Sequence, residues 1–328
     1  MKAHRIIRSV LPVALAAGLL AVLVTKANAG DVWDQVRRAD PLWLPVIIAA
    51  LYASDWFRAV RLQHLLSPIA RPRLSLLFAA AQLGSAVNLL LPIRAGEAVR
   101  MRILSQRAGI SVASLVAIWF SEIVSDLVAF IVYIIVAVLL VKEARFLWPL
   151  ALVGAVLAVA GGAGAYYLGG RIDRSVEGRD IVARGLRGWF ERELYNLEMG
   201  LQSFRDPKVI FHVSWSAQGI WLCEVLMFYA CGRALGLDLS PWAYLLLLVV
   251  ANVAGAVPIT QSGFGVFEVT LTGLIVALGA DQAQAAAYAI FVHVLLTFPH
   301  VISGPLAAVA LGINPATILF GEASPYEE

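Results

Sequence analysis

Residues 112 to 141 form one apolar stretch that contains only two charged side chains, Glu122 and Asp126. About 20 apolar residues in a helix cross the hydrocarbon core of a bilayer, so this stretch alone predicts a transmembrane helix. The chain is 60% hydrophobic and 14% charged, whereas soluble domains are roughly 45–50% apolar and about 25% charged. We therefore expect an all-α, polytopic membrane protein. The other predicted spans are 9–25, 42–60, 146–169, 209–232 and 284–312.

Two further apolar stretches, 74–92 and 240–279, are interrupted by Pro, Gly and polar residues. Irregular backbone at membrane depth is tolerated only where protein or a water-filled cavity surrounds it. We expect 74–107 and 240–279 each to form a re-entrant or broken-helix hairpin that enters and leaves on one side. The fold is thus about six full spans with two hairpins, in a single integral membrane domain covering 1–328.

The distribution of Lys and Arg predicts the orientation, because cytoplasmic loops are enriched in both. With the N-terminus inside and both hairpins as described, 19 basic residues fall inside and 6 outside. We expect a multi-pass protein of the cell inner membrane with both termini cytoplasmic. In 171–208, Arg alternates with acidic residues, which predicts an amphipathic helix on the cytoplasmic surface. Ala27-Asn28-Ala29 resembles a signal-peptidase site, so cleavage of residues 1–29 remains an alternative.

A faint internal repeat links the two predicted hairpins. In each, an apolar helix containing Asn is followed by Pro-Ile, a polar turn, Gly, and a Glu that begins the next helix. The predicted topology enters the two copies from opposite sides, which makes them an inverted repeat with broken helices, as in many transporters. The first copy contains Asn88, Pro92, Arg94, Gly96 and Glu97, and the second contains Asn252, Pro258, Gly263, Gly265 and Glu268.

The turns of these two copies are candidates for binding an acidic head group. Each turn precedes a helix whose exposed N–H groups and positive dipole attract anions. Arg94, Glu97 and Arg100 share one helical face, and Arg presents a planar fork suited to phosphate. The alternative is an Arg–Glu–Arg network that only stabilises the turn. The predicted substrate-binding residues are Arg94, Arg100, Asn88, Gly96, Gly263 and Gly265.

Acidic residues inside predicted membrane helices are costly and mark candidate functional sites. Glu122 and Asp126 lie at i, i+4 on one face, and two nearby carboxylates suit a proton relay. The alternative is that they pair with Arg94 or Arg100 and stabilise the fold. The predicted gating or proton-linked residues are Glu97, Glu122, Asp126, Glu224 and Glu268.

Other polar residues are assigned structural roles. His293, Thr297 and His300 form a helical stripe without metal-ligand spacing, which favours a polar stripe in the core. Asp55, Arg58 and Arg61 come at the end of the predicted span 42–60 and are interpreted as interfacial anchors, with a possible attraction for anionic lipid. The sequence has no P-loop or dinucleotide-binding motif, and its net charge is only +3. We expect no metal, no other cofactor, no nucleic-acid partner and no enzymatic activity.

The two motifs, 88–100 and 258–268, resemble those of the transmembrane region of lysylphosphatidylglycerol synthases, also known as flippase-like integral membrane proteins. The Glu122/Asp126 helix and residues 57–66 fit the same family. The resemblance implies a fold of eight or so membrane segments and translocation of lipids between leaflets. It also implies a membrane lipid or polyprenyl-linked substrate, and a lipid-modifying enzyme or glycosyltransferase as a possible partner.

Three departures limit what the resemblance implies. Gln261-Ser262-Gly263 stands where the family usually has Pro-Gly-Gly, so this turn should be less constrained. His293 lies near a position where Arg is common. Because the chain stops soon after 284–312, aminoacyl transfer is not expected. The alternative function is a non-transporting accessory protein that presents a lipid intermediate to a glycosyltransferase or lipid-modifying enzyme.

Overall fold

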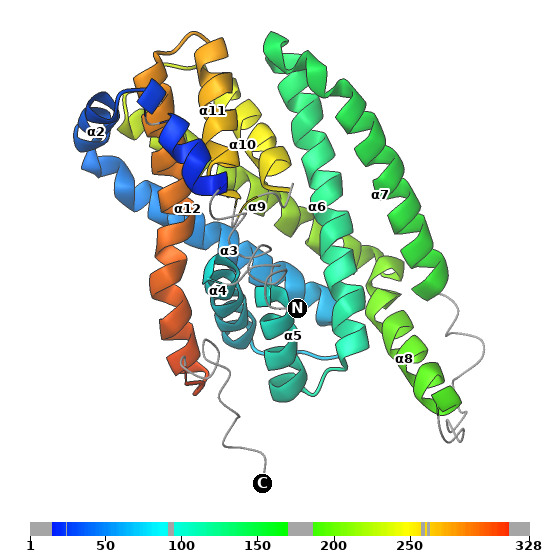
Figure 1. Ribbon diagram of the computed structural model, residues 1–328. Helices are drawn as coiled ribbons and strands as arrows, with labels where there is room; N and C mark the ends of the chain where they lie inside the picture. Colours follow the sequence, from blue (N-terminus) through cyan, green and yellow to red (C-terminus); the bar gives the residue numbers. More distant parts are fainter. Residues whose placement is uncertain are drawn as a thin grey trace, which may run out of the picture.

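The computed structural model describes residues 15–23, 25–90, 95–169, 186–256, 260 and 263–314, which are helical with short connections and no strand. The predicted all-α, polytopic membrane fold is confirmed (Figure 1). Within the described residues, four helices are long and apolar enough to cross a membrane. They are α6 (Val112–Leu140), α7 (Trp148–Gly169, preceded by η2, Lys142–Leu147), α9 (Pro207–Ala234) and α12 (Gln282–Ala310).

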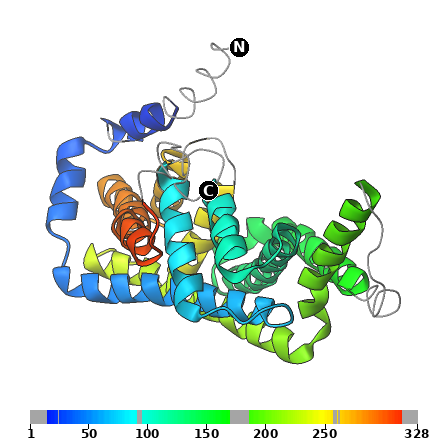
Figure 2. The same ribbon diagram turned by 90° about the horizontal axis from the view of Figure 1, so that it is seen from below.

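The predicted span 42–60 begins in η1 (Pro41–Trp43) and continues into α3 (Leu44–Leu66), which extends beyond the predicted end. Three charged residues in its second half keep α3 out of the group of clearly apolar spans. In Figure 2 it runs lengthwise across the lower part of the view, whereas α12 is seen close to end-on. α3 packs along α9, where a Cβ on Gly219 would lie 2.8 Å from the Phe57 ring. Close helix contacts at small residues are typical of membrane bundles.

Two helix pairs occupy opposite ends of the molecule (Figure 1). The pair α4 (Leu74–Leu90) and α5 (Ala95–Ala108) lies in the lower half, and the pair α10 (Pro241–Ala256) and α11 (Val266–Ala277) lies in the upper half. With 17 residues, α4 is about 25 Å long, which is less than the roughly 30 Å hydrocarbon core. These pairs coincide with the predicted hairpins 74–107 and 240–279. Their re-entrant placement in a membrane stays a prediction.

Polar caps explain where the long helices begin. The Ser111 side chain accepts from the Ser114 N–H at the start of α6, and Asp206 accepts from the Lys208 N–H at the start of α9. Asp281 accepts from two backbone N–H groups at the start of α12. Such caps satisfy N–H groups that have no partner within the helix. The long apolar helices therefore start at defined polar positions that also mark the ends of the bundle.

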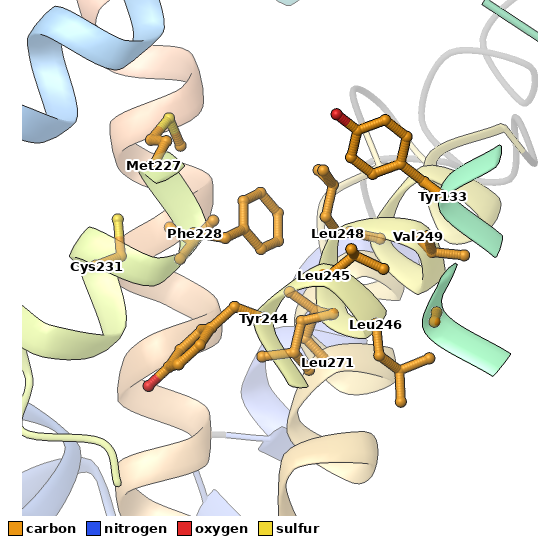
Figure 3. Packing of buried hydrophobic residues seen from close by; sticks show 14 of the residues in the cluster. Tyr133, Met227, Phe228, Cys231, Tyr244, Leu245, Leu246, Leu248, Val249 and Leu271 are labelled. Atoms are coloured by element: carbon orange, nitrogen blue, oxygen red, sulfur yellow. The ribbon is translucent and has the colours of Figure 1, made fainter. Parts of the chain in front are cut away.

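A large apolar core fills the upper half, where α9, α10, α11 and α12 meet (Figure 3). Tyr244 packs against Gly232, where a Cβ would lie 2.2 Å from its ring. Its hydroxyl donates to the Leu237 carbonyl at 2.6 Å, and the Tyr288 hydroxyl donates to the Phe228 carbonyl at 2.9 Å. Buried Tyr hydroxyls need such partners. The core thus holds the α10–α11 pair firmly against the long helices.

The segment 171–208, predicted to be an amphipathic helix, contains α8 (Leu186–Leu201) and the short η4 (Gln202–Arg205). Residues 170–185 lie outside the described part. α8 exposes Trp189, and the C-terminal end of α8 packs against α6. The Ser114 hydroxyl donates to the Asn196 carbonyl at 2.7 Å. Its location at a cytoplasmic surface stays a prediction. Near the N-terminus, residues 15–23 are helical and α2 (Ala29–Arg37) follows.

Candidate functional site

A cavity of about 400 Å³ lies between α3, α4, α5, α6, α9 and α12. Its described lining is unusual for the interior of a membrane protein because it contains three guanidinium groups and five carboxyl groups. Ionisable groups at such positions are expensive and commonly mark substrate or ion pathways. The charged and titratable lining residues are Arg58, Arg61, Arg100, Asp55, Glu97, Glu122, Asp126, Glu224 and His300.

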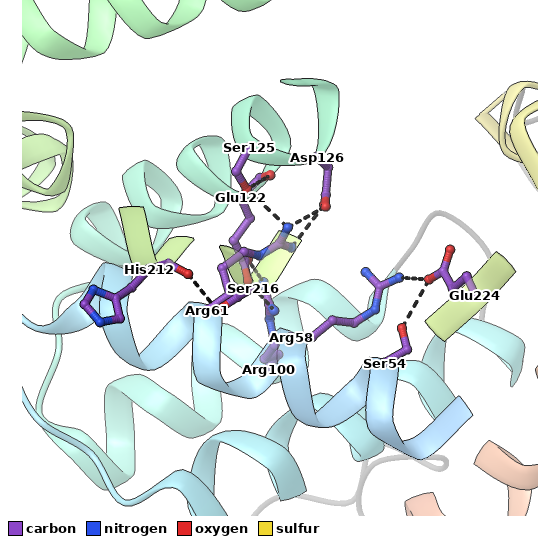
Figure 4. A network of polar contacts seen from close by, with 10 residues as sticks. All are labelled: Ser54, Arg58, Arg61, Arg100, Glu122, Ser125, Asp126, His212, Ser216 and Glu224. Carbon is purple, nitrogen blue, oxygen red and sulfur yellow. Dashed lines mark hydrogen bonds and ion pairs between the residues drawn. The ribbon is translucent and has the colours of Figure 1, made fainter. Parts of the chain in front are cut away.

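The two acids of α6 each have a cationic partner (Figure 4). Glu122 accepts hydrogen bonds from both terminal nitrogens of Arg100, and Asp126 accepts from both terminal nitrogens of Arg61. Arg61 also donates to the Ser125 hydroxyl at 3.1 Å. Forked Arg–carboxylate pairs are strong and directional. The predicted shared face of Glu122 and Asp126 is therefore present, but each acid is held by a different helix.

A third ion pair joins α3 to α9. Arg58 donates to Glu224, whose Oε1 also accepts from the Ser54 hydroxyl at 3.3 Å (Figure 4). The Arg58 side chain is 40% exposed, whereas that of Arg61 is only 3% exposed. Arg58 is therefore the guanidinium that a group entering the cavity would reach most easily.

Asp55 occupies another wall of the cavity. Its Oδ2 accepts from Gln82 Nε2 of α4 at 2.7 Å and lies 3.1 Å from His300 Nε2 of α12. The Gln82 amide oxygen in turn accepts from the Ser303 hydroxyl at 2.6 Å. These hydrogen bonds connect α3, α4 and α12 at one point.

The first predicted turn borders this cavity. Arg100 lies 3.0 Å from Glu97 one turn earlier, and both line the cavity. The Asn88 side-chain oxygen accepts from the Gly96 N–H at 2.8 Å, so α4 caps the start of α5. A Cβ on Gly96 would lie 1.9 Å from the Gly84 carbonyl oxygen, which explains the need for glycine there. Arg94 lies outside the described residues.

The second predicted turn forms a separate site. Gly263 and Gly265 adopt φ of +79° and +85°, a region that favours glycine. Glu268 Oε2 accepts from the Gly265 N–H at 2.7 Å, and its Oε1 lies 2.7 Å from Nδ1 of His293, whose ring stacks on Phe264. None of these residues belongs to the described lining of the cavity. The structure therefore groups Glu97, Arg100, Glu122, Asp126 and Glu224 and places Glu268 elsewhere.

The interpretation of Asp55, Arg58 and Arg61 as interfacial anchors is wrong. Asp55 and Arg61 are 7% and 2% exposed, and all three residues line the cavity. The predicted span ended at residue 60, whereas α3 continues to Leu66, so these charges lie within the helix. The sequence did contain a signal for this cavity wall, namely three charged residues within seven positions of a long helix. The contribution of His300 was not evident, because its partner Asp55 is 245 residues away.

Comparisons with known proteins agree with this architecture. Residues 9–304 match the model of the lysylphosphatidylglycerol synthase TM region. The chain is 26% identical to a protein named Glycosyltransferase AglD from Haloferax volcanii, over 93% of this chain and 55% of that protein. It is 24% identical to a protein named UPF0104 membrane protein from Methanothermobacter thermautotrophicus, over 88% of this chain and 91% of that protein.

The chain thus spans about half the length of the first of these relatives and most of the second. The family match extends from the first predicted span into the last long helix, and it includes every helix that lines the charged cavity. On this evidence the chain belongs to the family of lysylphosphatidylglycerol synthase transmembrane regions.

Proposed function

We propose that this protein moves a lipid or lipid-linked substrate between the leaflets of the cytoplasmic membrane. The observation that carries the proposal is the charged cavity of about 400 Å³ inside an apolar helical bundle. A charged head group cannot cross the hydrocarbon core without a polar environment. A cavity bordered by a broken helix pair provides such an environment, while the acyl or prenyl chains remain in lipid.

Exchangeable ion pairs support this proposal. Arg58 and Arg100 are each paired with a carboxylate in the cavity, and a phosphate on the head group has the geometry to replace that carboxylate. The carboxylates released in this way would then repel one another, which would loosen α6 from α5 and α9 from α3. Arg94, which directly precedes α5 in the sequence, is proposed to contact the same phosphate. Glu97, Glu122, Asp126 and Glu224 act in this mechanism as gating partners.

The second helix pair is proposed to act from the opposite side. Glu268 fixes the turn at Gly265, and movement of the two pairs in opposition would open the cavity to each leaflet in turn. We propose that both termini are cytoplasmic, so the α4–α5 pair faces the cytoplasm. In this orientation the head group enters from the inner leaflet.

Leaflet exchange in vesicles that contain only the purified protein tests this function. The panel is labelled phosphatidylglycerol, aminoacylated phosphatidylglycerol, a polyprenyl phosphate and a polyprenyl-linked sugar. We expect exchange of one class, lost in Arg94→Ala and Glu268→Ala and retained in Arg145→Ala, a control at an exposed position of η2. A folded protein that exchanges none of these lipids would refute the proposal.

A second candidate is a non-catalytic accessory protein that presents a lipid intermediate to a glycosyltransferase or lipid-modifying enzyme. The observation that favours it is the relative named a glycosyltransferase, in which the matching region is about half of a longer chain. Under this alternative, the protein co-purifies with such an enzyme, and vesicles that contain the protein alone show no exchange.

A further inference from the structure

The hydrogen bonds of His300 determine how many protons it shares with Asp55. His300 Nδ1 lies 3.0 Å from the Leu296 carbonyl oxygen, and His300 Nε2 lies 3.1 Å from Asp55 Oδ2. A carbonyl oxygen only accepts hydrogen bonds, so the contact with Leu296 is a hydrogen bond in the protonation states that place a hydrogen on Nδ1. In a neutral imidazole Nε2 then has no hydrogen, and it would face an ionised carboxylate with lone pair against lone pair. Both contacts are therefore hydrogen bonds at the same time only when one additional proton is present, on Nε2 or on Oδ2.

The other buried histidine pair in the described residues has no such requirement. His293 Nδ1 lies 2.7 Å from Glu268 Oε1, and a neutral imidazole with its hydrogen on Nδ1 satisfies that contact. The carboxylates of Glu122, Asp126 and Glu224 are also satisfied without a proton, because guanidinium groups donate to each of them. Among these groups, the Asp55–His300 contact alone needs a proton that can be exchanged.

This proton also fixes the position of α12. Ser303, one turn after His300, donates to Gln82, and Gln82 donates to the same Asp55 oxygen. These bonds form a ring through α12, α4 and α3. Pro299 lies next to His300 inside α12, where a missing backbone N–H weakens the helix and permits bending. Loss of the proton breaks the ring beside this weak point.

We propose that Asp55 and His300 form the proton-binding site of this protein, and that occupancy by a proton couples the position of α12 to the charged cavity. The proposal rests on the proposed transport function and identifies its co-transported ion. Release of the proton adds one negative charge to the cavity wall and removes the Asp55–His300 hydrogen bond, which leaves the Tyr52 hydroxyl, donating to the Pro299 carbonyl at 3.4 Å, as a link between α3 and α12. The charged groups that face the same cavity are Arg58 and Arg61 of α3, Glu97 and Arg100 of α5, Glu122 and Asp126 of α6, and Glu224 of α9.

The proton is measurable without any transport assay. Nuclear magnetic resonance of the purified protein with ring-¹⁵N-labelled histidine reports His300 protonation, and infrared difference spectroscopy reports the Asp55 carboxyl group. At pH 7 we expect either an imidazolium at His300 or a protonated carboxyl at Asp55. In Asp55→Asn, the Asn amide can donate to Nε2, so His300 should become neutral. A neutral His300 beside an ionised Asp55 in the unmodified protein at pH 7 would overturn the proposal.

Coupling is tested in vesicles with an imposed pH gradient and a lipid that the protein exchanges. With one proton per lipid, a gradient of one pH unit should shift the leaflet distribution by up to about tenfold. In Asp55→Asn and His300→Gln, the exchange that persists should lose this shift, so that the leaflet distribution is the same with and without the gradient. His64→Asn is the matched control, because His64 lies on α3 outside the cavity lining.

The two experiments separate the two ideas. If no lipid is exchanged at all, the transport function fails, and the spectroscopic result alone decides the proton site. If lipids are exchanged and the gradient shifts Asp55→Asn as strongly as the unmodified protein, the coupling role of this pair is refuted.

Discussion

At the scale of single residues, the pair of Arg100 and Glu122 is held in place by burial. The two side chains are only 14% and 6% exposed, so water solvates neither charge well. Arg100→Met leaves the Glu122 carboxylate without its guanidinium partner, and such a loss costs about 3–5 kcal/mol. Replacing both residues removes both charges. We therefore expect Arg100→Met combined with Glu122→Leu to be more stable than Arg100→Met alone, as measured by thermal unfolding in detergent.

Arg145→Met provides the control for this cycle, because Arg145 is exposed in η2 and its loss should change the free energy of unfolding by less than about 0.5 kcal/mol. Strictly additive effects of the two cavity substitutions would mean that Arg100 and Glu122 do not interact in the folded protein.

Asn88 offers a second test, because it caps a helix to which it does not belong. Its side-chain oxygen accepts from the Gly96 N–H at 2.8 Å, at the start of α5. We expect Asn88→Ala to lower the free energy of unfolding by about 1 kcal/mol, the usual loss for a helix cap. The repeat supplies the control. Asn252 is exposed and donates to Leu248 in its own helix, so Asn252→Ala should be nearly neutral. Equal losses in both variants would argue against a specific cap at Asn88.

At the scale of helices, α12 and α4 touch at a position where only a small residue fits. A Cβ on Gly304 would lie 2.2 Å from the Ala86 Cβ. Gly304→Ala should therefore destabilise the protein by about 1–3 kcal/mol through overpacking. Adding Ala86→Gly removes the clash and should recover part of this loss, although Gly costs about 1 kcal/mol in a helix. Thermal unfolding of the single and double variants measures the recovery, and its absence would show that the two helices do not meet at these residues.

Helix existence was largely predictable from the sequence, because apolar length is a local property. The predicted spans 112–141, 146–169, 209–232 and 284–312 correspond to α6, α7, α9 and α12 with shifts of a few residues. The end of α3 was not predictable in this way. Its charged residues reduce the apolar signal at residue 60, while ion pairs with α6 and α9 stabilise the helix to Leu66.

The candidate site was predictable only where its residues are close in sequence. The shared face of Glu122 and Asp126 follows from their i, i+4 spacing. Their partners do not follow from local spacing, since Arg61 lies 65 residues from Asp126 and was itself interpreted as an interfacial anchor at the end of a predicted span. Asp55 and His300 are even further apart in the sequence, at 245 residues. A single sequence contains local periodicity, whereas these pairs depend on how α3, α6 and α12 pack.

At the scale of the whole molecule, the largest apolar core and the charged cavity lie in different regions. The largest apolar core surrounds the α10–α11 pair, while the charged cavity lies against the α4–α5 pair. Burial of apolar surface and the Tyr hydrogen bonds favour one rigid arrangement in the upper half. The cavity half has a smaller apolar cluster, and the helices around the cavity itself are joined by ion pairs and hydrogen bonds, which water or a charged ligand can replace. We expect conformational change to begin in the lower half for this reason.

The predicted placement of the two helix pairs in the membrane can be tested by labelling single cysteines. The background for these variants lacks Cys223 and Cys231, the two natural thiols. Both would be replaced by Ala, since neither has a disulfide partner in the structure. Inside-out and right-side-out vesicles then report which side of the membrane each introduced thiol faces. Exposed positions at the ends of the helix pairs are the informative ones.

Arg71→Cys and Gln106→Cys lie at exposed positions just before α4 and near the end of α5. If 74–107 enters and leaves on one side, an impermeant maleimide labels both from the cytoplasm. If the segment crosses the membrane, the maleimide labels the two cysteines from opposite sides. Asp238→Cys and Gln282→Cys flank the α10–α11 pair and should both label from outside. Because an inverted repeat requires both results together, labelling of either pair on opposite sides would remove the structural basis for alternating access.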